Sequence, residues 1–180
     1  DPILLIPQRI KVDGKALNPK SLETLLSQDA VKDSFKNVED YTDRFYHEML
    51  NIFDSEEFNG VSVESCNRSQ FVARFKKYEL RHRFLSGQKV YHNFDKNKVN
   101  KMKSLEVLAQ GIYYKLYSDL KRKVNKNDII DVLIMTTAPY TDTFISEGNS
   151  IDVYKKIVRQ NKCGIKSNHM TLSELRKKVL

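Results

Sequence analysis

Cysteine, glycine and proline are scarce in this sequence, and tryptophan is absent. The two cysteines, Cys66 and Cys163, lie far apart and form no disulfide framework, so we expect a reducing, cytoplasmic environment. The four histidines form neither an HxH nor an HExxH pattern, which disfavours a zinc site. Six glycines and four prolines are too few for a linker protein or a turn-rich β-sandwich.

Long apolar runs are missing as well. No stretch approaches the ~18 consecutive apolar residues of a membrane-spanning helix, and no signal-peptide pattern opens the chain, so we expect no membrane partner. The chain has 180 residues, of which 40% are hydrophobic, and this is enough for one core. We expect a single domain over residues 1–180, with a helical part in residues 1–60 and an α/β part in residues 61–180.

The net charge of +8 is spread unevenly along the chain. Residues 1–73 carry 8 Lys+Arg against 13 Asp+Glu, residues 74–126 carry 15 against 4, and residues 127–180 carry 8 against 6. The middle third is therefore the basic part, and aromatic residues alternate with its cations, as in FVARFKKYELRHRF. Such a mixture can neutralise phosphates and stack on unpaired bases, which predicts a surface for nucleic acid, RNA before DNA.

Eight cations of this basic region are the candidate nucleic-acid contacts. They are Arg74, Lys76, Lys77, Arg81, Arg83, Lys121, Arg122 and Lys123. Two other interpretations stay open. The same residues would also suit solvated helix faces, and the dipole of a preceding helix would favour the last three without any ligand. An anionic membrane surface ranks third, because no helix combines a bulky apolar face with a lysine-only polar face.

Apolar spacing and capping residues predict a helix-rich α/β chain. Helices are expected over residues 38–54, after Asn67, from Ser104 to Leu120, from Asn127 or Asp128 to Pro139, from Asn149 or Ser150 to Gln160, and from Thr171 onward. Strands are expected in GVSVES, at Thr143–Ser146 and near CGIKSNH. The segment ILLIPQRIKV predicts a strand, LNPKSLETLLSQ predicts a short helix, and GQKVYHNF fits a strand or a loop.

Four carboxylates stand among apolar residues in NDIIDVLIMTTAPYTDTFISEG. Asp128 and Asp131 are one helical turn apart on the same face, Asp142 precedes the predicted strand, and Glu147 follows it. Strand ends and first helical turns meet at one edge of an α/β layer, so we expect the acids to converge there. Carboxylates held together repel one another unless a cation neutralises them, which predicts Mg²⁺ or Mn²⁺.

Each of these acids also has a purely structural interpretation. Asp128 would serve as a helix cap, Asp131 as a surface residue, Asp142 as a turn residue and Glu147 as part of a loop. If the acids do hold a metal, its chemistry would be phosphodiester hydrolysis by an activated water. The catalytic residues would then be all four acids, with Asp128, Asp142 and Glu147 as metal ligands and Asp131 in support.

The order N-D-x-x-D, an apolar helix, then Y-x-D-x-F-I-[ST]-[DE] resembles the C-terminal half of PIN-domain nucleases. Here it is Asn127-Asp128, Asp131 and then Tyr140-Thr141-Asp142-Thr143-Phe144-Ile145-Ser146-Glu147, and the likeness covers about residues 104–175. The resemblance implies a Rossmann-like α/β/α sandwich whose acidic pocket binds one or two Mg²⁺ or Mn²⁺ ions and hydrolyses RNA, less often DNA. It also implies that Asp128 and Glu147 are metal ligands.

The sequence departs from that family in two places. The family's first strand ends in a metal-binding aspartate followed by Thr-Asn or Thr-Ser, which this sequence does not contain, so that strand lies upstream or is lost. Glu147 also replaces the usual aspartate. Two functions therefore follow: a metal-dependent endoribonuclease, or a catalytically degenerate PIN-like module for nucleic-acid binding or protein assembly. A helical interaction domain is a third hypothesis, and a protein partner or homo-oligomer stays open.

Overall fold

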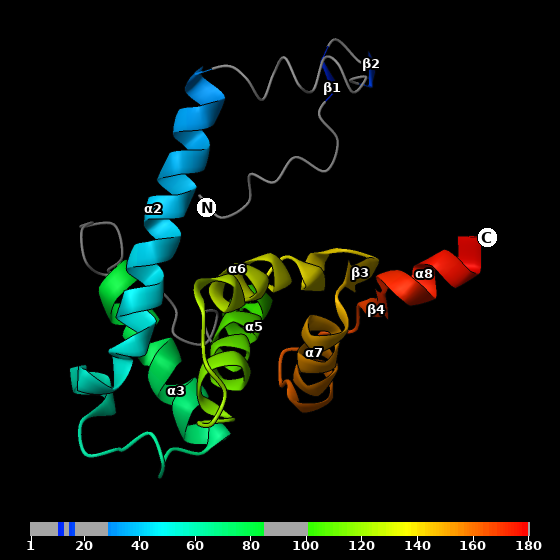
Figure 1. The fold of residues 1–180 in the computed structure, drawn as a ribbon. Coiled ribbons are helices and arrows are strands. Elements are labelled where there is room, and N and C mark those ends of the chain that lie inside the picture. The colour runs from blue at the N-terminus through cyan, green and yellow to red at the C-terminus, as the bar shows by residue number, and fades with distance from the viewer. Residues whose placement is uncertain (1–10, 13–14, 17–28, 85–100, 180) are drawn as a thin grey trace. The chain divides into compact units, whose positions relative to one another are not determined.

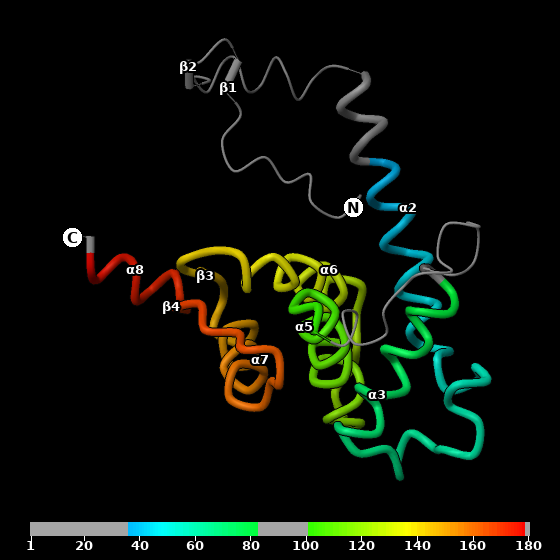
Figure 2. Tube along the Cα trace, turned by 180° about the vertical axis from the view of Figure 1, so that it is seen from behind, coloured from blue at the N-terminus to red at the C-terminus, as the bar shows by residue number. Residues whose placement is uncertain are grey.

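The computed structural model describes residues 11–12, 15–16, 29–84 and 101–179. The chain divides into two compact units, Asp1–Phe45 and Tyr46–Leu180. Figure 1 follows the elements along the ribbon, and Figure 2 shows the same chain from behind. None of the helices in the described ranges is long and apolar enough to cross a membrane.

The first unit contains a small antiparallel ribbon and most of helix α2. Strand β1 (Lys11–Val12) pairs with strand β2 (Lys15–Ala16). Helix α2 spans Asp29–Leu50 and continues into the second unit. The helix predicted over residues 38–54 is thus confirmed, but it begins earlier and ends at Leu50. The strand and helix predicted in ILLIPQRIKV and LNPKSLETLLSQ lie outside the described residues, apart from β1, as does GQKVYHNF.

The second unit is helix-rich and includes a small parallel sheet. Its α-helices are α3 (Arg68–Glu79), α5 (Lys103–Ile112), α6 (Lys126–Met135), α7 (Gly148–Gln160) and α8 (Leu172–Val179). Shorter 3₁₀ turns cover Ile52–Asp54, Glu56–Phe58 and Ala138–Tyr140, and π-helical turns cover Leu80–Phe84 and Tyr113–Tyr117. The strands are β3 (Thr143–Ser146) and β4 (Asn168–Thr171).

Strands β3 and β4 run parallel, with Phe144 opposite His169. Parallel strands require a long crossover connection, and helix α7 supplies it, so β3, α7 and β4 form a βαβ unit. The strand predicted at Thr143–Ser146, the last strand near CGIKSNH and the helix between them are therefore confirmed. The helix-rich α/β class is confirmed at this level.

Local capping explains where several helices begin. The Asn67 side chain accepts from the Gln70 amide at 3.0 Å, and the Gln70 side chain accepts from the Asn67 amide at 3.1 Å, which is a capping box. Thr171 and Glu174 form a second box, because the Glu174 amide donates to the Thr171 hydroxyl at 3.1 Å and the Thr171 amide donates to the Glu174 carboxylate at 2.6 Å. The helices predicted after Asn67 and from Thr171 onward are confirmed.

Two local predictions are wrong. GVSVES forms no strand, because Ser65 donates from its amide to the Ser62 carbonyl at 3.2 Å and the two hydroxyls lie 3.1 Å apart, which turns the chain. The helix predicted to reach Leu120 ends with the π-helical turn at Tyr117. A turn at Asp119 follows, in which the Asp119 side chain accepts from the Lys121 amide at 3.1 Å. Lys121–Lys123 therefore lie beyond the helix end.

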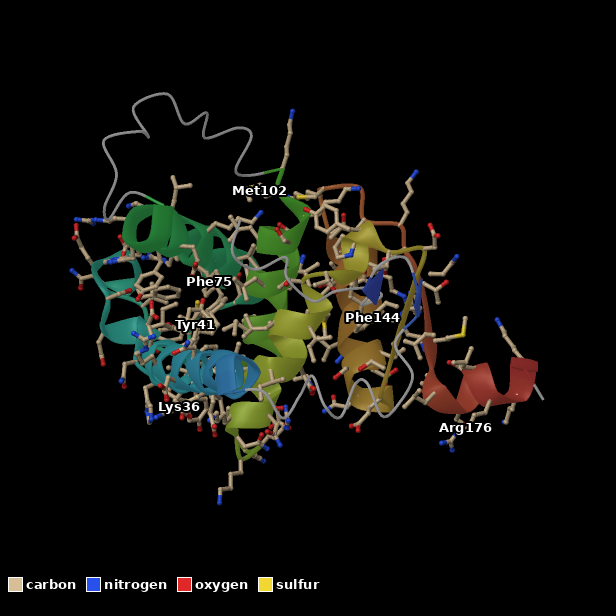
Figure 3. All side chains as sticks on the ribbon, turned by 90° about the horizontal axis from the view of Figure 1, so that it is seen from above. Lys36, Tyr41, Phe75, Met102, Phe144 and Arg176 are labelled. Carbon is tan, nitrogen blue, oxygen red and sulfur yellow. The ribbon has the colours of Figure 1, made fainter. Side chains whose placement is uncertain are left out.

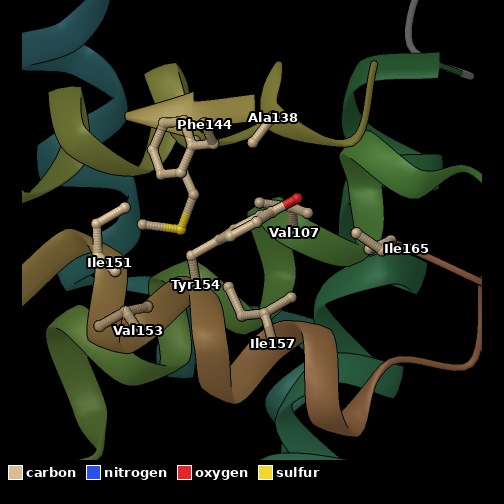
Figure 4. Close-up of a cluster of buried hydrophobic side chains, with 9 residues drawn as sticks. Val107, Ala138, Phe144, Ile151, Val153, Tyr154, Ile157 and Ile165 are labelled. Carbon is tan, nitrogen blue, oxygen red and sulfur yellow. The ribbon is translucent and has the colours of Figure 1, made fainter. Parts of the chain in front are cut away.

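Helix α7 packs on the sheet through an apolar core (Figure 4). Tyr154 of α7 is fully buried, and its ring centroid lies 5.0 Å from that of Phe144 on β3. The other buried members of this cluster are Val107, Met135, Ala138, Ile151, Val153, Ile157 and Ile165. They come from α5, α6, the 3₁₀ turn Ala138–Tyr140, α7 and the segment before β4, so this core fixes the βαβ unit against helices α5 and α6.

Helices α5 and α6 meet at Gly111, where we expect substitution to destabilise the fold. A Cβ atom added at Gly111 would lie 2.8 Å from Cγ1 of the buried Val132. Overpacking of this kind costs about 1–3 kcal/mol, and the better helix propensity of alanine offsets roughly 1 kcal/mol of it. We expect Gly111→Ala to lower the free energy of unfolding in urea by up to about 2 kcal/mol.

Gly148→Ala is the matched control, because a Cβ added at that helix start would meet no atom within 4 Å apart from those of its chain neighbours and its own helix backbone. It should leave the unfolding free energy unchanged or raise it by about 0.5 kcal/mol. Equal effects of the two substitutions would contradict the close packing of α5 on α6.

Candidate functional site

The acidic motif begins in the first turn of α6, where Asp128 is buried. The Asn125 side chain caps this helix, and the Asn125 amide donates to Oδ2 of Asp128 at 3.0 Å. Oδ1 of Asp128 accepts from Nη2 of Arg122, and Nζ of Lys115 lies 3.9 Å from the same oxygen. Asp128 is therefore a capping residue whose charge is compensated by two cations of the chain.

Asp131 lies one turn further along α6 and is bound by the same lysine. Nζ of Lys115 donates to Oδ2 of Asp131 at 2.8 Å, and the Ser150 hydroxyl of α7 donates to that oxygen at 3.0 Å. Lys115 also reaches the Ser150 hydroxyl at 3.3 Å. The prediction that Asp128 and Asp131 share a face is confirmed, and Lys115 joins that face to α7.

Lys115 is the residue that sequence reasoning missed here. It lies in the π-helical turn after α5, and it is 2% exposed. A charged side chain is almost never so buried unless it is paired, so the lysine and the two aspartates depend on one another. One signal was visible in the sequence, because Lys115 directly precedes Leu116 in the apolar spacing that continues from Ile112. We call Lys115, Arg122, Asp128, Asp131 and Ser150 the charge network.

Asp142 and Glu147 lie at the two ends of β3, as predicted, and both side chains are exposed. The Asp142 carbonyl accepts from the Asn168 amide at 3.1 Å, so its backbone holds the start of β4. Glu147 occupies the N-cap position of α7, and its carbonyl accepts from the Ile151 amide at 3.0 Å. Within the described ranges, no three His, Cys, Asp or Glu side chains form a group that could hold a metal ion. The metal site thus stays a prediction.

Four of the eight candidate nucleic-acid contacts are bound within the protein. Lys76 pairs with the buried Glu106, Arg81 pairs with Glu56 at 2.6 Å, and Arg122 pairs with Asp128. Arg74 donates to the Glu57 carbonyl. Lys77, Lys121 and Lys123 are exposed, and the Arg83 side chain lies outside the described residues. Lys76, Arg81 and Arg122 of the basic region therefore compensate acids of the same chain.

The buried acid Glu57 lies beside two residues of the basic region, Arg81 and His82. Its side chain is fully buried, and Arg81 lies 3.2 Å from Oε1 while His82 lies 3.5 Å from Oε2. Burial by itself would raise the pKa of the Glu57 carboxyl, but its own backbone amide, Arg81 and His82 together hold that pKa below its ordinary value. The carboxylate is therefore stable in its charged form, with Arg81 as a structural partner.

A different basic region is exposed at the C-terminal end. All eight Lys and Arg residues of the last third lie within residues 155–178, where Glu174 is the single acid. Seven of them are exposed: Lys156, Arg159, Lys162, Lys166, Arg176, Lys177 and Lys178. They lie on the second half of α7, on the segment before β4 and on α8. We call these seven residues the C-terminal basic surface.

The sequence did not reveal this surface, because the charges of residues 127–180 were counted together and the acids of the acidic motif offset its lysines and arginines. Lys155 approaches Asp152 at 3.9 Å, and Nζ of Lys156 lies 5.5 Å from the ring centroid of Tyr114. Arg176 lies on the outer side of α8 in Figure 3.

Comparison with known proteins finds no match for this chain: no protein-family model, no curated protein and no solved structure is significantly similar to it.

Proposed function

We propose that this chain is a nucleic-acid-binding module, RNA before DNA, that holds the phosphate backbone through the C-terminal basic surface. The observation that carries the proposal is the division of charge between the two basic regions. In residues 74–126, Arg74, Lys76, Arg81, Lys115 and Arg122 are bound to groups of the same chain. Exposed cations that face few acids attract a polyanion, because binding releases its counterions.

The acidic motif supports binding without catalysis. A metal at Asp128 would have to compete with Arg122, Lys115 and the Asn125 amide for the same two oxygens. The charge network already supplies the positive charge that these carboxylates require, so the degenerate form of the PIN-like module fits better than the nuclease. The metal-dependent nuclease stays a prediction, with Asp142 and Glu147 as its exposed candidates.

The finer fold remains part of the same proposal. The parallel β3–α7–β4 unit and the acidic motif, which runs from α6 through β3, support a Rossmann-like, PIN-like α/β/α arrangement. The two-stranded sheet of the described residues is much smaller than such a sandwich requires. A protein-assembly role is the weaker alternative, because no described feature identifies a protein partner.

Salt dependence of RNA binding tests the function. We expect a fluorescent single-stranded oligouridylate to bind in metal-free buffer, with log K falling linearly against log salt concentration. Replacing Arg159 and Arg176 by glutamine should reduce the steepness of that line by about 0.7 for each phosphate that the variant no longer neutralises. The double substitution Lys121→Gln/Lys123→Gln removes the same charge from the middle third and should have the smaller effect.

Two results would contradict this proposal. If the oligonucleotide does not bind, or if its binding does not depend on salt, the C-terminal basic surface does not bind nucleic acid electrostatically. Cleavage of the oligonucleotide in Mn²⁺ that disappears in Asp128→Asn would instead assign the chain to metal-dependent hydrolysis.

A further inference from the structure

An open pocket lies beside strand β4, within the second unit. Its volume is about 570 Å³, which falls in the range of small-molecule sites. The lining comes from the start of β3, from α7, from the segment leading through β4, and from α8. The residues are Thr143, Val158, Lys166, Ser167, Asn168, His169, Met170 and Lys178. Two members of the C-terminal basic surface, Lys166 and Lys178, therefore meet at one pocket.

The lining of this pocket is cationic and polar on one side. Lys166 and Lys178 are exposed, and no aspartate or glutamate is among the lining residues. Thr143 and Asn168 add a hydroxyl and an amide. A lysine ammonium is a compact point charge that suits phosphate, and two of them can balance a phosphate monoester dianion. Glu174 of α8 interacts with Lys178, so the net charge of the lining is smaller than two and favours an anion such as a phosphate group.

The wall behind these groups is held in place by α7. The Tyr154 hydroxyl forms a hydrogen bond with the Ser167 hydroxyl, and the Tyr154 ring meets that of His169 edge-on at a centroid distance of 5.9 Å. Nδ1 of His169 lies 3.4 Å from the Ser167 carbonyl oxygen. Because Tyr154 is fully buried, these contacts fix Ser167 and His169 before any ligand arrives.

Two apolar side chains complete the lining. Val158 of α7 and Met170 of β4 offer a surface without hydrogen-bonding groups, and methionine adapts well to flat ligands. A bare inorganic anion would leave these side chains without a partner. A phosphate that carries a sugar and a base would use both the cationic and the apolar parts of the lining.

We propose that this pocket binds a nucleoside phosphate monoester, presented as the phosphorylated end of a nucleic-acid strand. This inference rests on the proposed function, since it assigns one end of the bound strand to the pocket beside β4. The remaining members of the C-terminal basic surface would then hold the phosphates that follow along the strand. A free nucleoside monophosphate carries the same group and is the second source of the ligand.

The test compares three oligouridylates of one length: with a 5′-phosphate, with a 3′-phosphate, and with hydroxyl groups at both ends. We expect one phosphorylated form to bind the wild-type chain about tenfold more tightly than the hydroxyl form, as for a charge-assisted contact. In Lys166→Gln/Lys178→Gln this preference should disappear. Uridine monophosphate should compete with the preferred strand for the wild-type chain. This competition shows whether a free nucleotide also binds in the pocket.

Lys162→Gln/Lys177→Gln is the matched control, because these exposed lysines lie in the same segment and helix but do not line the pocket. It should weaken all three strands equally and keep the preference. Salt-dependent binding without any preference for a phosphorylated end would contradict the role of the pocket and leave the proposed function intact. A preference abolished equally in both double variants would also overturn it. If uridine monophosphate binds the wild type but no strand does, the pocket stands and the proposed function fails. If nothing binds, both fail.

Discussion

Lys115→Met should destabilise the protein by about 3 kcal/mol, because it removes the cation between Asp128 and Asp131. Breaking a buried pair costs about 3–5 kcal/mol, since the remaining charge has no compensation. The lower end applies here, as the Asp131 side chain is 38% exposed and Asp128 keeps Arg122. Urea unfolding followed by circular dichroism measures the difference, and Lys162→Met, at an exposed lysine, should change the free energy by less than about 0.5 kcal/mol.

A second substitution separates the effect of charge from the effect of packing. Lys115→Met/Asp131→Leu removes both partners, and such replacements are often close to neutral, so we expect most of the stability to return. If the double variant is no more stable than Lys115→Met, Lys115 stabilises the fold through packing and not through its charge.

Lys115→Met also tests whether a lysine or a metal ion is the natural partner of the two aspartates. Only a ligand that binds the folded state raises the melting temperature. We expect Mn²⁺ to leave the melting temperature of the wild type unchanged and to raise that of Lys115→Met, in which the two aspartates lack their lysine. A rise in the wild type that is absent from Asp128→Asn would show that the acids hold a metal in spite of Lys115, and would favour the nuclease.

Features set by neighbours in the chain were predictable from the sequence. The boxes at Asn67 and Thr171 each depend on residues three positions apart, and β3 has four residues bounded by turn residues. GVSVES shows the limit of this approach. Its alternation of apolar and polar residues fits a strand as well as it fits the turn that the structure has there. The hydrogen bonds between Ser62 and Ser65 compete with that strand and close a turn instead.

The candidate site was predictable in one respect and not in another. Spacing placed Asp128 and Asp131 on one face, and the structure agrees. The Mg²⁺ or Mn²⁺ expected beside them stays a prediction, and the cation that the structure places there is Lys115. The identity of that cation depends on contacts of Lys115 with residues 16 and 35 positions away, which periodicity cannot reveal. The same limit applies to Lys76 and Glu106, which lie 30 positions apart and together remove one cation from the expected nucleic-acid surface.

The stability of the second unit depends strongly on an aromatic cluster around Phe71 of α3. Phe71 is fully buried, and five aromatic rings surround it at centroid distances between 5.1 and 6.1 Å. Those rings belong to Phe53, Phe58, Phe75, Tyr113 and Tyr117. The cluster thus joins the 3₁₀ turns and α3 to the π-helical turn that carries Lys115. Aromatic pairs of this geometry add to the effect of burial alone.

Phe71→Ala should lower the free energy of unfolding by about 3–5 kcal/mol, because it creates a cavity and removes ring contacts. Tyr140→Ala is the control, since this aromatic side chain is 60% exposed and its removal should change the free energy by less than about 0.5 kcal/mol. Phe71→Leu should recover about half of the loss by filling part of the cavity. A decrease below about 1 kcal/mol for Phe71→Ala would mean that Phe71 is not the centre of this core. Because Tyr113 and Tyr117 flank Lys115, a loosened cluster should also weaken the charge network, so Phe71→Ala and Lys115→Met should combine with less than additive effect.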